Sequence, residues 1–343
     1  MSQCLAEMTM TFEQYLNRNA KRMNKLVADF FREGLAPDMT RYLYEPLARY
    51  SANGGKRHRP LICELACQAV GGDIVLARSA GAAIEHFHTA ALIHDDIADE
   101  ATLRRGEPCM HLTQGEGLAI NAGDLALSQV TGLIVEDSYL NDHVKLRVLD
   151  ELVKMTTRTI EGQALDIGWA RDGRFDIGID DYLLMAAHKT AYYSGATPLA
   201  VGAIVGGGSE EEIEALRTFG MATGLAFQIQ DDILNLIGRK EAVRKDFRSD
   251  IVEGKRTLIV VHAIQSSDRA DELIAILSSH TAQPAVLATA VDIMQASGSF
   301  DYARQYAIGL VERAKTELSE ALSPSEARAL LLSMADFFVS RMH

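Results

Sequence analysis

Proline and cysteine are scarce in this chain of 343 residues, which has 7 prolines and 4 cysteines. The cysteines are Cys4, Cys63, Cys67 and Cys109. They are too few and too scattered for a disulfide framework, so we expect a reducing, cytoplasmic compartment. The N-terminal segment lacks the apolar core of a signal peptide, and no run reaches the roughly 18 apolar residues of a membrane span. We therefore expect no stable membrane insertion.

A surplus of positive charge is also missing, because the formal net charge is −13. Nucleic acids and anionic membranes are bound by basic surfaces, so we expect neither as a partner. An anionic ligand must instead be held locally, by metal ions or by a few placed Lys and Arg residues. The hydrophobic fraction of 48% and the charged fraction of 24% are close to average globular usage and predict a folded protein.

Sustained strand-type alternation is missing as well, whereas Ala- and Leu-rich segments with helical spacing of apolar residues are frequent. These segments are 12–31, 60–71, 76–98, 120–137, 144–166, 181–206, 210–237, 256–266, 270–279, 302–318 and 310–321. The run TLIVVHAI at 257–264 is β-branched enough for a buried strand but has no convincing strand partner. No linker or repeat divides the chain, so we predict an all-α fold in one domain, 1–343.

Two acidic motifs follow apolar runs. The stretch LIHDDIADEATLRR at 92–105 places Asp95, Asp96 and Asp99 on one side of a helix, and FQIQDDILN at 227–235 repeats the pattern with Asp231 and Asp232. A solvated acidic face is the alternative for either motif alone. Carboxylates this close repel one another, so the pair predicts two helices facing a cavity that holds Mg²⁺, a cation that prefers oxygen ligands and bridges carboxylates to phosphates.

Short cationic clusters accompany the acidic motifs: GGKRHRP at 54–60, RR at 104–105, HKT at 188–190 and GKRT at 254–257. Surface solubility is the ordinary reading of any one of them. Four clusters with adjacent Gly, Thr or Pro in an acidic protein instead favour contacts to phosphate groups.

These motifs carry a family resemblance. Over about residues 50 to 265, six motifs occur in the order and spacing of the trans-isoprenyl diphosphate synthases. They are GGKRHRP, HTAALIHDDIADEATLRRG, EGQALD, KT, FQIQDD and DIVEGKRT. The resemblance implies a bundle of largely antiparallel helices around a deep central cavity, with the two acidic motifs at its mouth. It implies an Mg²⁺-dependent condensation of isopentenyl diphosphate with dimethylallyl, geranyl or farnesyl diphosphate, and a homodimer.

The resemblance also assigns residues. Mg²⁺ would be held on the allylic diphosphate by Asp95, Asp96, Asp99, Asp231 and Asp232. The same diphosphate would be contacted by Arg104, Lys189, Lys245 and Lys255. Isopentenyl diphosphate would be bound by Lys56, Arg59, His88 and Arg105. The residues near the reacting carbons would be Thr190 and Gln228, and the mid-chain helix motif contributes Gln163 and Asp166.

The chain departs from the family at a few positions. Asn235 replaces the last Asp of the second motif, from which we expect weaker metal binding. Arg248 and Ser249 stand where small residues are frequent, and Arg341 is the only basic residue near the C-terminus that is positioned to fold over the site.

Two other functions share parts of this pattern: a non-catalytic subunit of a partner synthase and a class I terpene cyclase. A cyclase has no use for the isopentenyl-site cations Lys56, Arg59 and Arg105, and a degenerate subunit would be expected to lose aspartates. The three cations and the aspartates of both acidic motifs are all present, so the pattern favours the synthase.

Product length depends on the residues below the first motif. Short-chain members of the family have bulky aromatics at the positions of Ala90 and Ala91, so we expect a cavity open past fifteen carbons. Phe87, a turn deeper, is the first large side chain that could form a floor, unless it packs into the bundle instead. We predict geranylgeranyl diphosphate as product, with a longer-chain or farnesyl diphosphate synthase as alternatives.

Overall fold

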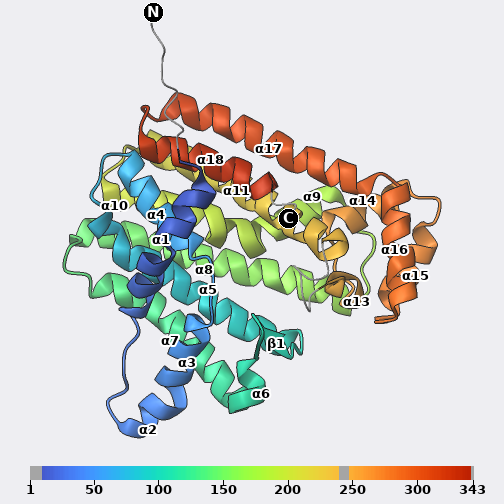
Figure 1. Ribbon diagram of the computed structural model, residues 1–343, viewed down its shortest axis with the longest axis horizontal. Coiled ribbons are helices and arrows are strands. Elements are labelled where there is room, and N and C mark those ends of the chain that lie inside the picture. The colour runs from blue at the N-terminus through green and yellow to red at the C-terminus, as the bar shows by residue number, and fades with distance from the viewer. Residues whose placement is uncertain (1–9, 239–246, 341–343) are drawn as a thin grey trace, which may run out of the picture.

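The computed structural model describes residues 10–238 and 247–340 (Figure 1). These residues form helices and one short hairpin, which confirms the all-α prediction. The first half comprises α1 (Phe12–Ala28), α2 (Pro37–Met39), the π-helical η1 (Thr40–Tyr44), α3 (Glu45–Ala52), α4 (His58–Ala69), the 3₁₀-helical η2 (Ile74–Ala77), α5 (Arg78–Ala98), β1 (Leu103–Arg104), β2 (Glu107–Pro108), α6 (Met110–Gln114), α7 (Glu116–Val135) and α8 (Asp142–Arg171).

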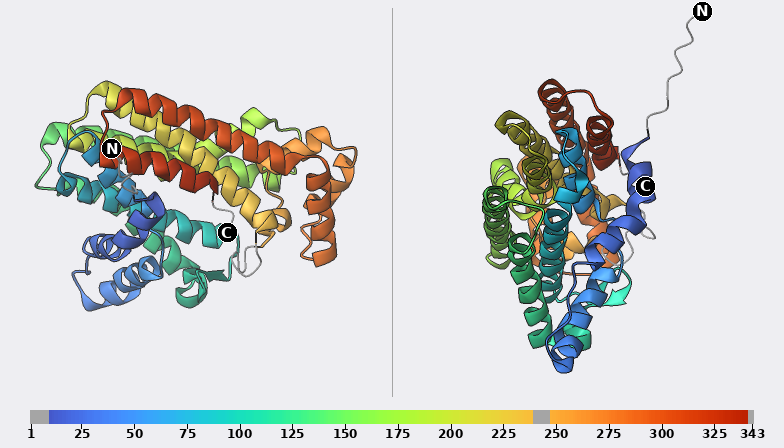
Figure 2. Two further views of the ribbon diagram at one scale, coloured as in Figure 1. Left: turned by 45° about the horizontal axis from the view of Figure 1, so that its top comes forward. Right: turned by 90° about the vertical axis from the view of Figure 1, so that its left-hand side faces the viewer.

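The second half continues the bundle. It comprises α9 (Ile179–Ala186), the π-helical η3 (Ala187–Ala196), α10 (Thr197–Gly206), α11 (Glu210–Ile237), α13 (Ser249–Val252), α14 (Leu258–Ser266), α15 (Ala270–Ser278), α16 (Pro284–Ala296), α17 (Ser299–Ala321) and α18 (Glu326–Ser340). The long helices α11 and α17 run side by side along the molecule, η3 packs between α11 and α8, and α15 and α16 form one end (Figures 1 and 2). The first and last helices meet, since the Phe12 ring lies 5.8 Å from the Phe337 ring.

The buried apolar side chains form two clusters. The larger one runs through the whole bundle and includes residues from α1 to α18. The smaller one lies among α3, α5, α6 and α7, and consists of Leu47, Tyr50, Ala90, Ile93, Met110, Ala119, Ala122 and Ala126. α5 contributes to both clusters, so its opposite faces pack against different parts of the molecule.

The sequence misjudged the backbone in two places. The segment 181–206 is not one regular helix, because its centre is the ten-residue π-helix η3. The loop 104–108 contains the two-residue strands of the hairpin, paired at Leu103 with Pro108 and at Arg104 with Glu107. The ambiguous run at 257–264 is helical as predicted, and Thr257 begins α14 by accepting a hydrogen bond from the Val260 amide at 3.3 Å.

One described helix, α7, meets the length and composition of a membrane span, contrary to our expectation that no segment would. It packs along α5, and 44% of its apolar window is buried inside the molecule. A core helix of a globular bundle passes the same test.

Close packing holds η3 against α8. A Cβ at Gly162 in α8 would lie 2.2 Å from the Lys189 amide nitrogen, whereas a Cβ at Gly168 in the same helix would meet nothing within 4 Å. We therefore expect Gly162→Ala to lower the free energy of unfolding by about 2–3 kcal/mol, since backbone must move to relieve the clash. Gly168→Ala should raise it by up to about 1 kcal/mol through helix propensity. Urea denaturation followed by circular dichroism measures both, and equal effects would contradict the packing argument.

Candidate active site

Three neighbouring cavities of different character meet at η3. An acidic cavity of about 70 Å³ shares Lys189 with an apolar cavity of about 360 Å³. The acidic cavity also shares Thr190 and Gln228 with a cationic cavity of about 390 Å³. Tyr193 lines both the cationic and the apolar cavity. Lys189, Thr190 and Tyr193 of this one π-helix thus each line two of the three cavities. π-Helical turns are frequent at functional sites.

The acidic cavity brings the second acidic motif together with α8, α9 and the segment around Lys255. Asp232 is 6% exposed and accepts hydrogen bonds from the Tyr182 hydroxyl at 2.9 Å and from Gln228 Nε2 at 2.6 Å. Asp250 lines the same cavity. Burial, and then the charge of Asp250, raises the pKa of Asp232 well above its usual value, and burial raises the pKa of Asp250 to about 6. Burial thus favours the protonated form of both carboxyl groups.

Two lysines enter this acidic region. Lys189 forms an ion pair with Asp166, and Lys255 lies 2.5 Å from a Glu253 oxygen and 3.9 Å from an Asp99 oxygen. Burial alone would lower the pKa of both lysines, but the surrounding carboxylates raise it, so both ammonium groups are charged. Lys255 thereby contacts Asp99 of the first acidic motif and lines the same cavity as Asp232 of the second.

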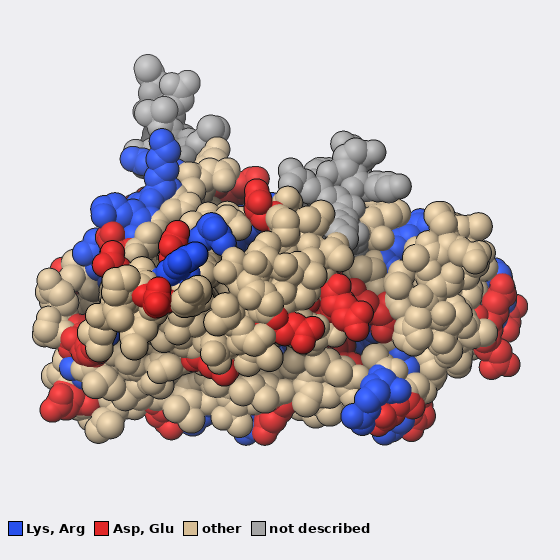
Figure 3. Space-filling model, turned by 90° about the horizontal axis from the view of Figure 1, so that it is seen from below, with Lys and Arg blue, Asp and Glu red and all other residues tan. Residues whose placement is uncertain are grey.

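The first acidic motif lies at the C-terminal end of α5, where the helix dipole is negative. Asp95 lines the apolar cavity and accepts a hydrogen bond from Gln163 Nε2 at 2.5 Å. Asp99 is the C-cap residue of this helix. Burial raises the pKa of its carboxyl to about 6; the charge of Lys255 opposes this rise and the charge of Asp95 adds to it. Figure 3 shows acidic side chains gathered in a recess of the underside of the molecule.

Asp96 lies differently from its two neighbours. It is 1% exposed and lines none of the three cavities. Its carboxylate accepts hydrogen bonds from the Tyr50 hydroxyl at 2.6 Å and from Arg104 Nε at 2.7 Å. The structure therefore places Asp96 and Arg104, which the sequence assigned to metal and diphosphate, in an ion pair with each other, beside rather than inside the cavities.

The cationic cavity gathers the four residues that the sequence assigned to isopentenyl diphosphate, Lys56, Arg59, His88 and Arg105, together with Asp231. Arg59 donates to Ser194 Oγ at 2.8 Å and lies 4.6 Å from the centre of the Tyr193 ring, but its Nε has no hydrogen-bond partner among the described residues. In the same part of the chain, residues 10–238 and 247–340, His88 Nδ1 also has no hydrogen-bond partner. Burial together with the charge of Arg59 lowers the His88 pKa well below its usual value. His88 is thus a neutral imidazole, with polar atoms around it open to a ligand.

Arg57, a residue that the sequence reading passed over, holds the loop before α4. Its backbone is left-handed, with φ of 51°, and its side chain is only 3% exposed. The guanidinium pairs with Glu85 at 2.7 Å and donates to the Ser51 carbonyl, while its Nε donates to Asn24 at 2.9 Å. These contacts fix the loop to α1, α3 and α5 on either side of Lys56 and Arg59.

The apolar cavity lies between α5, α7, α8 and η3. Phe87 and Ala91 line it, and the Phe87 ring also packs 5.7 Å from the Tyr193 ring. Phe87 therefore both borders the cavity and belongs to the core. Ala90 does not reach the cavity, because it is fully buried in the smaller cluster on the other face of α5.

Several partners of the predicted residues were missed by sequence reasoning. Asp250 stands inside the quoted motif DIVEGKRT, whose acidic residue we gave no role, whereas nothing in the sequence marks Tyr50 or Tyr182. Asn235 ties α11 to the following segment, since its side chain donates to Ser249 at 3.1 Å and accepts from the Asp250 amide at 3.3 Å. Lys245 and Arg341 lie outside the described residues.

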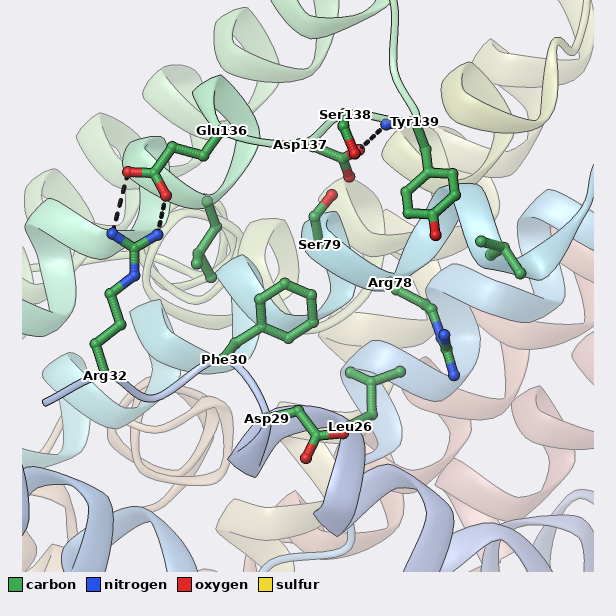
Figure 4. A pocket seen from close by; sticks show the side chains of 12 residues that line it. Leu26, Asp29, Phe30, Arg32, Arg78, Ser79, Glu136, Asp137, Ser138 and Tyr139 are labelled. Atoms are coloured by element: carbon green, nitrogen blue, oxygen red, sulfur yellow. Dashed lines mark hydrogen bonds and ion pairs between the residues drawn. The ribbon is translucent and has the colours of Figure 1, made fainter.

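A further cavity, of about 340 Å³, lies at the opposite end of α5 from Asp95 (Figure 4). Its acidic side chains are already engaged: Glu136 pairs with Arg32, Asp29 with Lys25, and Asp137 accepts from the Tyr139 amide at 2.6 Å. None of the predicted site residues that the structure describes lines it, so we place no chemistry there.

Comparison with known proteins agrees with this geometry. A family model described as polyprenyl synthetase matches residues 40–294. A short chain isoprenyl diphosphate synthase of Methanothermobacter thermautotrophicus is 38% identical over 327 residues, which cover 94% of this chain and 98% of the relative. The crystal structure of geranylgeranyl pyrophosphate synthetase from Pyrococcus horikoshii has 33% sequence identity and a TM-score of 0.88, covering 96% of this chain and 99% of that one.

A second solved structure carries ligands. It is geranylgeranyl pyrophosphate synthase from Corynebacterium glutamicum, complexed with isoprenyl diphosphate and magnesium, with 28% identity, a TM-score of 0.83, and coverage of 96% of this chain and 98% of that one. The family model, the two acidic motifs and the three cavities at η3 lead to one conclusion. The chain belongs to the polyprenyl synthetase family and is a trans-prenyltransferase with the all-α fold of the isoprenyl diphosphate synthases.

Proposed function

We propose that this enzyme condenses isopentenyl diphosphate head-to-tail with an allylic diphosphate and that its main product is geranylgeranyl diphosphate. The observation that carries the proposal is the meeting of an acidic, a cationic and an apolar cavity at η3. The three spaces suit, in turn, a metal-bound leaving group, a second diphosphate and a hydrocarbon chain.

The acidic residues fit Mg²⁺. Asp95, Asp99 and Asp231 would hold it, and Asp232 and Asp250 lie close by. Burial is the main cause that raises the carboxyl pKa values of Asp99, Asp232 and Asp250. Within the described residues, no three such side chains converge tightly enough to enclose an ion alone. Mg²⁺ needs no such cage, because it retains waters and joins one or two carboxylates to substrate phosphates. When bound, it would neutralise charge developing on the leaving diphosphate.

The two buried lysines would hold the allylic diphosphate. Lys189 and Lys255 are charged and lie at the border of the acidic cavity, where each already contacts a carboxylate. Asp166 would orient Lys189, and Asp96 with Tyr50 would fix Arg104 at the end of α5. Positive groups fixed in place before the reaction stabilise charge on a leaving group without reorganisation.

The cationic cavity would hold isopentenyl diphosphate. Lys56, Arg59 and Arg105 supply positive charge, and the neutral His88 would donate a hydrogen bond to a phosphate oxygen rather than act as a base. Gln228 would lie beside the reacting carbons, because its side chain accepts from Thr190 at 2.6 Å where the acidic and cationic cavities adjoin.

The carbon–carbon bond must form in a space from which water is excluded. When the carbon–oxygen bond of the allylic diphosphate breaks, the oxygen keeps the electron pair and the carbon becomes a cation. The isopentenyl double bond supplies the electrons of the new carbon–carbon bond, and the cation so formed loses a proton to the departing diphosphate. The apolar cavity would exclude water as a competing nucleophile.

The alternative functions are less well supported. A terpene cyclase needs no second diphosphate site, yet the cationic cavity gathers Lys56, Arg59 and Arg105. A non-catalytic subunit has no need for the full set of acidic residues. Incubation of the purified protein with Mg²⁺, isopentenyl diphosphate and each allylic primer in turn, followed by mass spectrometry, tests the proposal. Absence of any elongated diphosphate would refute it.

Product length provides a prediction for Phe87. Phe87→Ala should remove part of the cavity floor and yield longer products than the wild type, whereas Ala91→Phe should narrow the cavity and yield shorter ones. Chromatography of the dephosphorylated alcohols measures both, and circular dichroism checks the fold. Farnesol as the wild-type product would contradict the open cavity. An unchanged distribution in Phe87→Ala would mean that the ring only packs in the core.

We also propose the setting in which the enzyme works. Cys63, Cys67 and Cys109 are buried, which suits a reducing cytoplasm. The packing of the first helix on the last supports one domain over residues 1–343. Exposed apolar side chains along α8 support pairing of two copies.

A further inference from the structure

Arg256 is a buried cation of the acidic cavity for which the proposed reaction has no role. It belongs to the cationic cluster GKRT at 254–257, of which the resemblance assigns only Lys255 to the diphosphate. Arg256 is 3% exposed and lines the acidic cavity. Its guanidinium donates to backbone carbonyls, and among the described residues its Nη2 has no hydrogen-bond partner. Burial of a charge against neutral groups costs free energy, which indicates a function for this side chain.

The Arg256 guanidinium joins two segments that are far apart in the sequence. Its Nε donates to the backbone carbonyl of Arg174, in the loop between α8 and α9, at 2.6 Å. Its Nη1 donates to the carbonyl of Gly254, two residues earlier in the chain. The guanidinium also lies 3.9 Å from the centre of the Phe175 ring. Because a guanidinium is planar and rigid, these contacts fix the GKRT segment against the loop after α8.

The segment that Arg256 holds is the turn that carries Lys255. Gly254 has a left-handed backbone with φ of 67°, and a Cβ there would lie 3.4 Å from Arg256 Nη1. The next amide, that of Lys255, donates to the Asp250 carbonyl at 2.8 Å. The Lys255 ammonium then lies 3.9 Å from an Asp99 oxygen. The course of the backbone at Lys255 therefore depends on the Gly254 carbonyl, which Arg256 holds in place.

Arg256 also lies near the carboxylate that holds the other lysine of the cavity. Asp166 accepts a hydrogen bond from Lys189 and lines the same cavity as Arg256. Burial alone would raise the pKa of Asp166, but the charges of Lys189, Lys255 and Arg256 lower it. Asp166 is thus ionised and retains its ion pair with Lys189. The same guanidinium supports both lysines, one through the backbone and one through charge.

From these contacts we propose that Arg256 is a positioning residue, which sets the place of Lys255 for binding of the allylic diphosphate. The inference rests on the proposed function, in which Lys255 binds that diphosphate. Arg256 itself does not contact the substrate. A lysine loses rotamer freedom when its ammonium is fixed on a ligand. A backbone held in place beforehand lowers that cost, and the charge stands ready for the leaving group without reorganisation.

Arg256→Met tests this role, because methionine retains an apolar side chain beside the Phe175 ring but cannot donate to either carbonyl. The probe is geranyl S-thiolodiphosphate, an allylic analogue that resists cleavage, bound in the presence of Mg²⁺ and measured by calorimetry. We expect its Kd to rise about tenfold through loss of these hydrogen bonds. The KM for the allylic substrate should rise in parallel, while the KM for isopentenyl diphosphate stays within about twofold, because Arg256 does not line the cationic cavity.

Arg174→Ala is the matched control. It removes an exposed cation from the same loop, where the Arg174 side chain pairs with Asp176 at 2.5 Å, and leaves the backbone carbonyl that Arg256 contacts. Arg174 lines none of the three cavities. This variant should bind the analogue as the wild type does. An equal loss in Arg174→Ala and Arg256→Met would mean that general charge, rather than the position of Lys255, is responsible.

A double-mutant cycle separates positioning from direct contact. If Arg256 acts through Lys255, then Arg256→Met should change the Kd less than about twofold once Lys255 is alanine. An undiminished effect in that background would overturn the proposal. Arg256→Lys keeps the charge but offers a single nitrogen for two carbonyls, so it should bind the analogue nearly as weakly as Arg256→Met. Wild-type affinity in Arg256→Lys would equally contradict the positioning role.

Phe175→Leu approaches the same contact from the other side and applies even if Arg256→Met does not fold. Phe175 lines none of the three cavities, and its loss removes the ring beside the guanidinium. We expect the Kd of the analogue to rise about threefold. An unchanged Kd would count against the proposal. A wild type that binds no analogue, or forms no elongated product, refutes the proposed function instead, whereas an active wild type with normal binding by Arg256→Met refutes only the role of Arg256.

Discussion

Replacement of Asp231 or Asp95 by alanine is expected to lower kcat about a hundredfold or more while the fold is retained. Each carboxylate faces a cavity from the C-terminal part of a helix, where negative charge gathers without full compensation. Loss of either should weaken the hold on the cation that stabilises the leaving diphosphate. Steady-state rates at saturating Mg²⁺ and both substrates measure the effect, and circular dichroism verifies the fold.

Asp292→Ala provides the matched control, because Asp292 is an exposed aspartate on α16 that lines none of the three cavities. It should leave kcat unchanged. A second comparison comes from Asp96→Asn, which should act mainly through the Tyr50 and Arg104 contacts and cost less than Asp95→Ala. A near-normal rate for the folded Asp231→Ala or Asp95→Ala protein would refute the metal assignment.

The second large effect separates the two diphosphate sites. Arg59→Ala should raise the KM for isopentenyl diphosphate about tenfold or more, because it removes charge-assisted hydrogen bonds from the cationic cavity. Lys189→Ala should act mainly on the allylic substrate and on kcat, because this lysine borders the acidic and apolar cavities. Titration of each substrate at a saturating level of the other measures both effects.

Charge-conserving variants sharpen this comparison. Lys189→Arg keeps a positive partner for Asp166, whereas alanine leaves that 7%-exposed carboxylate without its ion pair. Partial recovery of allylic affinity in Lys189→Arg would show that charge, rather than local folding, is responsible. The opposite pattern, with Arg59 affecting only the allylic substrate, would mean that the two sites are exchanged.

The sequence was sufficient for the fold class and for most of the α-helices, because periodic apolar positions are a local property. It correctly favoured a helix at 257–264, where β-branched residues leave a strand possible. It missed α3, α16 and α18, whose short or weakly patterned segments are stabilised by packing against the remainder of the bundle. It also missed η3, since a π-helix depends on contacts such as that between Gly162 and the Lys189 backbone.

Within the site, the sequence by itself indicated which residue types would carry the proposed chemistry: paired aspartates for a cation, and Lys and Arg beside glycine for phosphates. Only the tertiary structure decided their orientation. Asp95 lines a cavity while the adjacent Asp96 is buried against Tyr50, and Ala91 borders the apolar cavity while Ala90 packs in the other cluster. Neighbouring residues on a helix point about 100° apart, so their roles depend on which elements pack against each face, and those elements come from distant parts of the chain.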